Sequence, residues 1–247
     1  MTPSPELSRA VLSDEIGANV RGVVSTARER ARNALTEEIL ESARGQLATV
    51  GAAALSLRAV ARDLGLASSA LYRYFPSRDD LLTRLIIEGY DALGAAAEAA
   101  DDPTAQPRTR WHAICAAVRA WALAHPHEYA LLYGSPVPGY AAPQDTVAAA
   151  GRVGLALGRV LGDAARAGVL PPAEGRRTHL VTPAAAAGLG GEHPDLDDAV
   201  RARALLTWSS LFGLVSFELF GHFVGVLTDP DAFFTEQVGE LADVLGL

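Results

Sequence analysis

The chain has 247 residues, enough for one large or two modest domains with a sizeable buried core. Hydrophobic residues make up 49% of it and aromatic residues only 6%, and alanine is abundant, which favours helix over strand throughout. A single cysteine, Cys115, excludes an internal disulfide and suits a reducing cytoplasm. No amino-terminal stretch resembles a signal peptide.

The formal net charge of −8 is unevenly distributed along the chain. Residues 1–90 hold 11 arginines and 11 acidic residues, whereas residues 91–247 hold 10 arginines and 18 acidic residues. The excess negative charge therefore lies in the second part. Charge alone permits the first part to bind DNA without demonstrating that it does.

Residues 1–31 form a polar extension with local positive charge from Arg21, Arg28, Arg30 and Arg32. We expect a frayed, solvated arm, because chain termini are usually loose. An arm that touches DNA phosphates is the alternative.

A helical period begins after this extension. From Leu35 and Ile39 onward an apolar residue recurs at every fourth position, as in an amphipathic helix. Ser56 is placed to cap a second helix, Pro76 closes a third, and Ser77 opens a fourth with capping-box spacing. The helices of this part are predicted at about 33–49, 57–64, 68–75 and 78–99.

The segment DDPTAQP at 101–107 breaks the pattern, and helices are expected again beyond it. Residues 182–195 have little periodicity and are predicted to form a loop. No internal repeat and no convincing strand is visible. The later helices are predicted at about 107–124, 126–133, 143–168, 196–226 and 230–245.

The spacing of three residues between 57 and 75 predicts a helix-turn-helix. Ala61 is small and lets the next helix approach closely, Gly65 makes the tight turn, and Leu71 anchors the third helix to the same core. In such a unit the second helix enters the major groove of DNA.

The third helix is predicted to turn Ala67, Leu71 and Phe75 inward and its polar residues outward. Tyrosine hydroxyls can bind phosphate oxygens, and Arg73 can reach a phosphate or a guanine edge. The tyrosines could instead pack against the fourth helix, Tyr72 above all. The candidate DNA-binding residues are Ser56, Arg58, Ser68, Ser69, Tyr72, Arg73, Tyr74 and Arg78.

The stretch LSLRAVARDLGLASSALYRYFPSRDDLL resembles the amino-terminal DNA-binding region of the TetR family of bacterial regulators, over about residues 33–80. Two positions depart from the family's usual run. Ala67 replaces a frequent capping serine, so the capping task passes to Ser68 or the cap is weaker. Arg78 replaces a lysine; either side chain can hold a phosphate, with different geometry.

Trp208, Phe212 and Gly213, in TWSSLFGLVSFELFGHF, resemble the Trp–His–Gly signature of one carboxy-terminal class of that family. Phe212 stands where histidine is expected, which puts a polar role there in doubt. The resemblance implies a helical ligand-binding domain that dimerises through its last two long helices. The apolar run 205–227 agrees independently, since it needs a large partner surface.

Residues 205–227 are also long enough to span a bilayer, but they contain Glu218 and His222, so a buried helix explains them better. These two residues lie one turn apart and could form a hydrogen-bonded pair. Neither a nucleophile elbow nor a phosphate-binding loop is present, so no catalytic residue is assigned.

Five aromatic residues could line a pocket between helices or simply fill the core: Trp111, Trp121, Tyr129, Tyr133 and Phe212. No arginine cluster suggests an anionic ligand, so the expected effector is apolar or weakly polar. Cys115, His125 and His127 do not have the spacing of a metal site, and no metal or cofactor is expected.

The sequence thus predicts an all-α protein in three parts: an extension at 1–31, a three-helix helix-turn-helix domain at 32–80, and a helical ligand-binding and dimerisation domain at 81–247. The predicted function is that of a cytoplasmic, homodimeric, ligand-responsive transcriptional regulator. We expect it to be a repressor, released from a pseudo-palindromic operator in double-stranded DNA by a small molecule. The alternative is a helical small-molecule-binding protein or enzyme that does not use its DNA-binding head.

Overall fold

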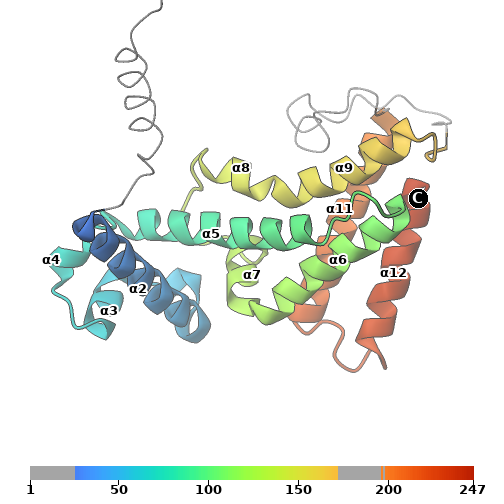
Figure 1. The fold of residues 1–247 in the computed structure, drawn as a ribbon. Helices are drawn as coiled ribbons and strands as arrows, with labels where there is room; N and C mark the ends of the chain where they lie inside the picture. Colours follow the sequence, from blue (N-terminus) through green and yellow to red (C-terminus); the bar gives the residue numbers. More distant parts are fainter. Residues whose placement is uncertain (1–25, 172–195, 197) are drawn as a thin grey trace, which may run out of the picture.

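The computed structural model describes residues 26–171, 196 and 198–247 (Figure 1). Those residues form helices and connecting turns, with no strand among them, which confirms the predicted all-α class. The elements are α2 (Ala27–Val50), the 3₁₀ turn η1 (Ala52–Ala54), α3 (Leu57–Asp63), α4 (Ser68–Leu71), α5 (Arg78–Ala99), α6 (Pro107–Ala124), α7 (Pro126–Tyr133), α8 (Thr146–Ala150), α9 (Arg152–Arg166), α11 (Asp198–Leu219) and α12 (Pro230–Leu245).

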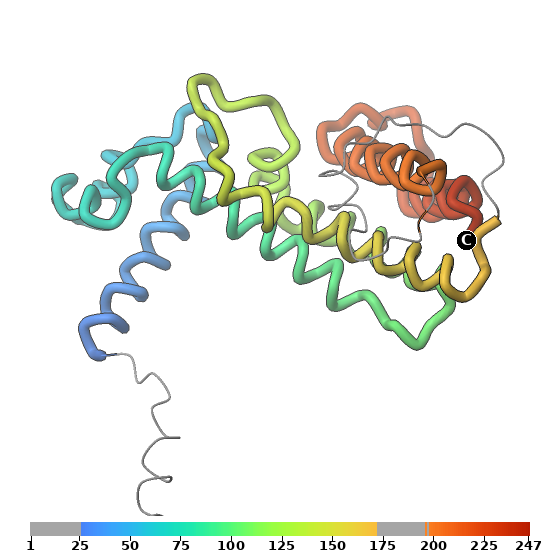
Figure 2. Tube along the Cα trace, turned by 90° about the horizontal axis from the view of Figure 1, so that it is seen from above, coloured from blue at the N-terminus to red at the C-terminus, as the bar shows by residue number. Residues whose placement is uncertain are grey.

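Two hydrophobic clusters divide the described fold, and α5 runs through both (Figures 1 and 2). Near its start α5 contributes Leu81 and Leu85 to the first cluster, which also contains the buried residues of α2, α3 and α4. Further along it contributes Leu93 and Ala97 to the second cluster, with α6, α7, α9, α11 and α12. We call the first cluster the head and the second the body. One continuous helix connects them, so the predicted division at residue 80 stays a prediction.

Helix ends fall where capping chemistry marks them. Ser77 accepts a hydrogen bond from the Asp80 backbone at the start of α5, and Asp229 does the same for α12. At the start of α2, Thr26 and Glu29 form a capping box, so this helix begins six residues earlier than predicted.

Glycines end or interrupt two helices that were predicted to be longer. The helix expected over 143–168 is two helices, α8 and α9, on either side of Gly151. The helix expected over 196–226 ends at Leu219, because Gly221 and Gly225 adopt positive φ angles of 80° and 75° in the turns that follow. The loop predicted at 182–195 lies outside the described residues.

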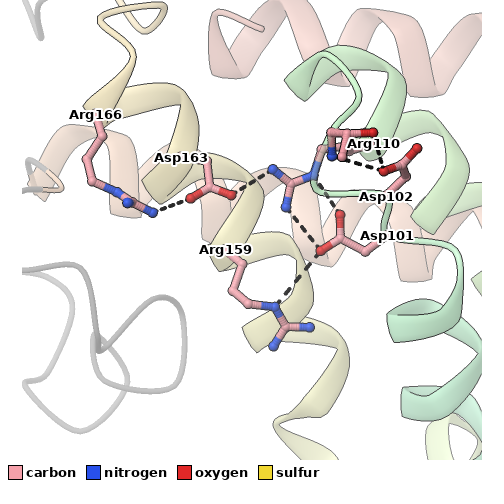
Figure 3. Close-up of polar contacts among 7 residues, drawn as sticks. Asp101, Asp102, Arg110, Arg159, Asp163 and Arg166 are labelled. Carbon is pink, nitrogen blue, oxygen red and sulfur yellow. Dashed lines mark hydrogen bonds and ion pairs between the residues drawn. The ribbon is translucent and has the colours of Figure 1, made fainter.

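A buried ion network fixes the bend between α5 and α6 (Figure 3). The side chain of Arg110 is only 3% exposed and binds Asp101 through both Nε and Nη2, at 2.6 and 3.1 Å. Its Nη1 donates to Asp163 of α9 at 2.7 Å, so three segments meet at one guanidinium. The hydrogen bonds to Asp101 raise the pKa of Arg110 above its usual value. The segment 101–107, which interrupts the helical pattern in the sequence, is therefore an ordered turn between α5 and α6.

None of the helices in the described parts combines the length and apolar character needed to cross a bilayer. Glu218, which lies within the apolar run 205–227, binds Arg119 at 2.6 and 2.7 Å. The ring of His222 lies against Phe217. The possible Glu218–His222 pair does not form, and the partner of Glu218 is Arg119 of α6 instead.

Candidate DNA-binding surface and ligand pocket

The turn between α3 and α4 has the predicted helix-turn-helix geometry. Gly65 has a φ of 65°, a region that favours glycine, and the next backbone amide, of Leu66, donates back to the Ala61 carbonyl at 2.8 Å. Ala61 is fully buried in the head cluster. The small side chain and the left-handed turn together let α4 cross close to α3.

The segment from α4 to Pro76 is anchored from behind by Leu71 and Phe75, which are 1% and 7% exposed. Only residues 68–71 are α-helical, and turn hydrogen bonds carry the chain on to Phe75. Ala67 is exposed, so its predicted inward position is wrong: it is the N-cap of α4 and precedes the helical face. No side chain caps this helix, so Ser68 does not take the capping task.

The outward side of this segment carries the candidate DNA contacts. Tyr72 is 43% exposed, which places its ring on the surface rather than against α5. Arg58, Ser69 and Arg73 are also exposed. Ser56, Ser68, Tyr74 and Arg78 are half-buried. The structure thus brings all eight candidates to one helix-turn-helix unit and its flank.

Arg78 has internal partners that the sequence did not reveal. Its Nε donates to the Leu55 carbonyl at 3.1 Å, and Nη2 donates to the Ala52 and Ala53 carbonyls at 2.8 and 3.0 Å. These carbonyls belong to η1 and its C-cap, and the Ala52 carbonyl also accepts from the Leu55 amide at 3.3 Å. Arg78 therefore holds the start of α5 against the segment before α3.

A buried glutamine in the head was missed at the sequence level. Gln46 is 8% exposed; its Oε1 accepts from the Ser56 amide at 3.2 Å and its Nε2 donates to Asp63 at 3.3 Å. The signal for Gln46 available in the sequence was its position, as a polar residue on the inward face of the first predicted helix.

Ser56 occupies the N-cap of α3 without a capping hydrogen bond from its side chain, contrary to prediction.

A cavity of about 640 Å³ lies in the body, next to the head. Its wall comes from α5, the end of α7, the 134–142 segment, α8 and Trp208 of α11. No acidic or basic side chain is among the residues that line it, and its volume is within the range of small-molecule sites. Three tyrosines, Tyr90, Tyr133 and Tyr140, are among the lining residues.

Burial raises the pKa of two phenols that line the cavity, Tyr90 and Tyr133, above the ordinary value. It also raises the pKa of the neighbouring Tyr129 to about 12. The rings of Tyr90 and Tyr133 meet edge to face at 5.8 Å. The cavity therefore presents neutral hydrogen-bonding groups on an aromatic wall.

Of the five predicted pocket residues, only Tyr133 lines this cavity. Phe212 does not line the cavity, but its ring stacks on that of Tyr133 with the ring centres 4.3 Å apart. Trp121 and Tyr129 belong to the body cluster, where the Tyr129 hydroxyl donates to the Phe212 carbonyl at 3.2 Å. Trp111 donates from its indole nitrogen to the Val238 carbonyl at 3.0 Å, beside a space of only about 10 Å³. Tyr90, Tyr140 and Trp208 line the cavity and were not predicted to.

The cavity and the head share a wall. Leu131, Val137 and Tyr140 line the cavity and also pack against the head cluster. The Tyr140 hydroxyl lies 2.9 Å from the hydroxyl of Thr83, near the start of α5. Side chains of this wall therefore contact both the cavity and the DNA-binding unit.

Among the described residues, no group of three or more His, Cys, Asp or Glu side chains could hold a metal ion. Cys115 is buried, and burial raises the pKa of its thiol well above the usual range. His125 binds the Trp121 carbonyl and stacks on the indole ring of the same residue.

A helix-turn-helix head joined to a helical body with a cavity defines a DNA-binding transcriptional regulator. Residues 39–85 match the family model for bacterial regulatory proteins of the tetR family, and residues 111–241 match the model for the tetracyclin repressor-like C-terminal domain. The chain belongs to the TetR family.

Relatives and solved structures agree with this assignment. The chain is 41% identical to the HTH-type transcriptional regulator Rv1816 of Mycobacterium tuberculosis, and equally to Mb1846 of Mycobacterium bovis, over 88% of this chain and 95% of each relative. It is 37% identical to the regulatory protein SCO4313, whose crystal structure matches with a TM-score of 0.69 over 90% of this chain and all of that one. A Rhodococcus protein of unknown function, at 24% identity, shares the fold with a TM-score of 0.67 over 92% of this chain and all of its own. The family consists of transcription regulators, not enzymes.

Proposed function

We propose that the protein is a repressor that a small molecule releases from a pseudo-palindromic operator. The supporting observation is the shared wall, because Leu131, Val137 and Tyr140 face both the cavity and the head. A ligand shifts a conformational equilibrium only by its differential affinity for the two states. Here a ligand that displaces these three side chains directly alters the surface against which the DNA-binding unit packs.

The proposed effector is an uncharged, largely apolar molecule with one or two hydrogen-bonding groups. A charged ligand would lose its hydration in a cavity whose lining holds no opposite charge. The Tyr90, Tyr133 and Tyr140 hydroxyls supply donors and acceptors for orientation.

The proposed active form is a homodimer that places two α4 segments in successive major grooves. Apolar side chains remain exposed along α11 and the turns after it: Leu206 is 56% exposed, Phe217 52% and Val224 83%. A patch of this kind is typical of a subunit interface. We expect the regulator to act in the cytoplasm, where its operator is.

At the DNA, the proposed contacts are the eight residues of the helix-turn-helix unit and its flank. Tyr72 and Arg73 are the most informative, since both are exposed on the anchored segment. Alanine at either position should weaken operator binding by about 1–3 kcal/mol and relax sequence preference if it reads a base edge. The measurement is fluorescence anisotropy on the fragment upstream of the protein's own gene. No sequence preference at any salt concentration would count against regulation.

Cavity filling tests the ligand response without knowledge of the ligand. Ala150 lines the cavity, whereas Ala148 of the same short helix is exposed and does not. Ala150→Trp should mimic an effector and weaken operator binding about 5- to 150-fold, the usual range of allosteric coupling. Ala148→Trp should leave binding unchanged. Equal operator affinity in a folded Ala150→Trp dimer contradicts the proposed ligand control. A reporter gene distinguishes a repressor from an activator by the sign of its change when the regulator is deleted.

A further inference from the structure

The first turns of α2 project away from the rest of the head (Figure 2). Residues 26–34 are all exposed, and the first buried residue of the helix is Ile39. The capping box of Thr26 and Glu29 stabilises this projecting end locally. The helix therefore holds its side chains in fixed directions outside the core.

One face of α2 is apolar where it packs in the head cluster and basic where it extends beyond the cluster. Arg28, Arg32, Leu35 and Ile39 follow one another at four-, three- and four-residue steps, so they lie along one side of the helix. Ile39 is fully buried and Leu35 packs against the head cluster. Beyond them the same side carries two arginines. Arg30 lies on the opposite side, where α2 faces away from the head.

This basic face meets the DNA-binding segment. The guanidinium carbon of Arg32 lies 5.7 Å from the centre of the Tyr74 ring, a cation–π distance. A guanidinium that stacks on an aromatic ring through its flat face keeps its in-plane N–H groups available to other acceptors. Tyr74 directly follows Tyr72 and Arg73, so the arginine face continues the exposed surface of the helix-turn-helix.

These arginines have no carboxylate partner among the described residues. The acid nearest in sequence, Glu29, accepts a hydrogen bond at 2.7 Å from the backbone amide of Thr26 and so serves the cap. Since residues 1–90 are neutral overall, the placement of arginines rather than net charge must create any positive surface on the head.

We propose that Arg28 and Arg32 form a second DNA contact, which binds backbone phosphates flanking the groove that α4 enters. The proposal rests on the helix-turn-helix surface proposed above. Each arginine that neutralises a phosphate releases condensed counterions, so it contributes to affinity for any duplex and steepens the salt dependence. Arg32 also holds Tyr74 in place, whereas Arg28 makes no recorded contact with it.

The test compares Arg28→Gln, Arg32→Gln and the matched control Arg30→Gln in the full-length dimer. All three remove one charge from the same helix end. Affinity is measured against salt on two probes, the fragment upstream of the protein's own gene and a random duplex of equal length. Because the dimer carries each substitution twice, the Arg28 and Arg32 variants should each reduce the slope of log K against log salt by about 1.8, equally on both probes. The Arg30 variant should reduce it by much less.

Three results would overturn the proposal. An unchanged slope for Arg28→Gln and Arg32→Gln removes the phosphate contacts. Equal losses in all three variants indicate a general charge effect without a defined contact. A loss confined to the specific probe, in Arg32→Gln alone, makes Arg32 only a support for Tyr74. The random duplex keeps this test separate from the proposed operator function, which fails if the unaltered protein shows no preference between the probes.

Discussion

Replacement of Arg110 by alanine should destabilise the body more than any other single arginine change among the described residues. The guanidinium is 3% exposed and Asp101 6% exposed, so the substitution leaves a buried carboxylate without its cation. Loss of one member of a buried pair costs about 3–5 kcal/mol, far more than loss of a surface pair.

The structure also sets the controls for this variant. Arg159 approaches the same Asp101 at 3.9 Å with a side chain 46% exposed, and Arg166 pairs with Asp163 at 59% exposure. Alanine at either position should cost about 0–1 kcal/mol. The Arg110 change should therefore lower the melting temperature by roughly 6–20 °C, at about 2–4 °C per kcal/mol for a chain of this size.

Urea unfolding at one fixed protein concentration measures these values, since a dimer's stability depends on concentration. A double-mutant cycle with Asp101→Ala separates the pair's coupling from the loss of either group. Operator affinity at 10 °C should stay within about twofold for a folded Arg110→Ala dimer, because the ion network lies at the end of α5 away from the head (Figure 1). A loss below about 1 kcal/mol in Arg110→Ala would show that solvent replaces the guanidinium, and would refute the structural role.

Three further predictions concern the head and the cavity. Arg78→Ala should unfold the head at lower denaturant than the body, as hydrogen exchange of α3 amides would show, because the Ala52, Ala53 and Leu55 carbonyls lose their hydrogen bonds from the guanidinium; uniform exchange across the chain contradicts this. Ser77→Ala should cost about 1 kcal/mol in urea unfolding through the lost cap of α5, and Ser77→Asp should restore it. Alkaline titration followed by phenolate absorbance should leave Tyr129 and Tyr133 un-ionised at pH 10, with Tyr90 ionising later than an ordinary phenol, and stability should fall between about pH 10 and 12, because the unfolded chain loses these protons first while burial raises the folded pKa of Tyr129 to about 12. Ionisation of all six tyrosines together near pH 10 would contradict it.

Helix boundaries were predictable where a local side chain determines them. Pro107, Pro126 and Pro230 each occupy the first position of a helix, where the missing amide proton costs nothing, and the three helices match their predicted ranges. The turn at Gly65 was predictable for the same reason, since it depends on one residue's backbone freedom.

Long-range partners were not predictable from these local rules. In the sequence, Arg78 is a basic residue placed where a phosphate ligand is expected. In the structure its guanidinium donates to carbonyls more than 20 residues away in the chain. Helical periodicity likewise cannot separate a pocket from a core: Tyr129 and Tyr133 are one turn apart on α7, but the first is fully buried and the second lines the cavity. The difference depends on the 134–142 segment, which has no periodicity of its own.

The position of α7 makes it the natural link between effector and DNA under the proposed function. Near its start, Glu128 lies 3.7 Å from Arg44 of α2, whose Nη2 also binds Glu88 of α5 at 2.7 Å. At its other end, Tyr133 faces the cavity. A shift of α7 therefore reaches the head twice, through the ion cluster on α2 and through the shared wall. Because the α2 contact is a partly exposed salt bridge, it opposes movement weakly. The packing of Leu131, Val137 and Tyr140 against the head then contributes most of the free-energy difference between the two positions of the head.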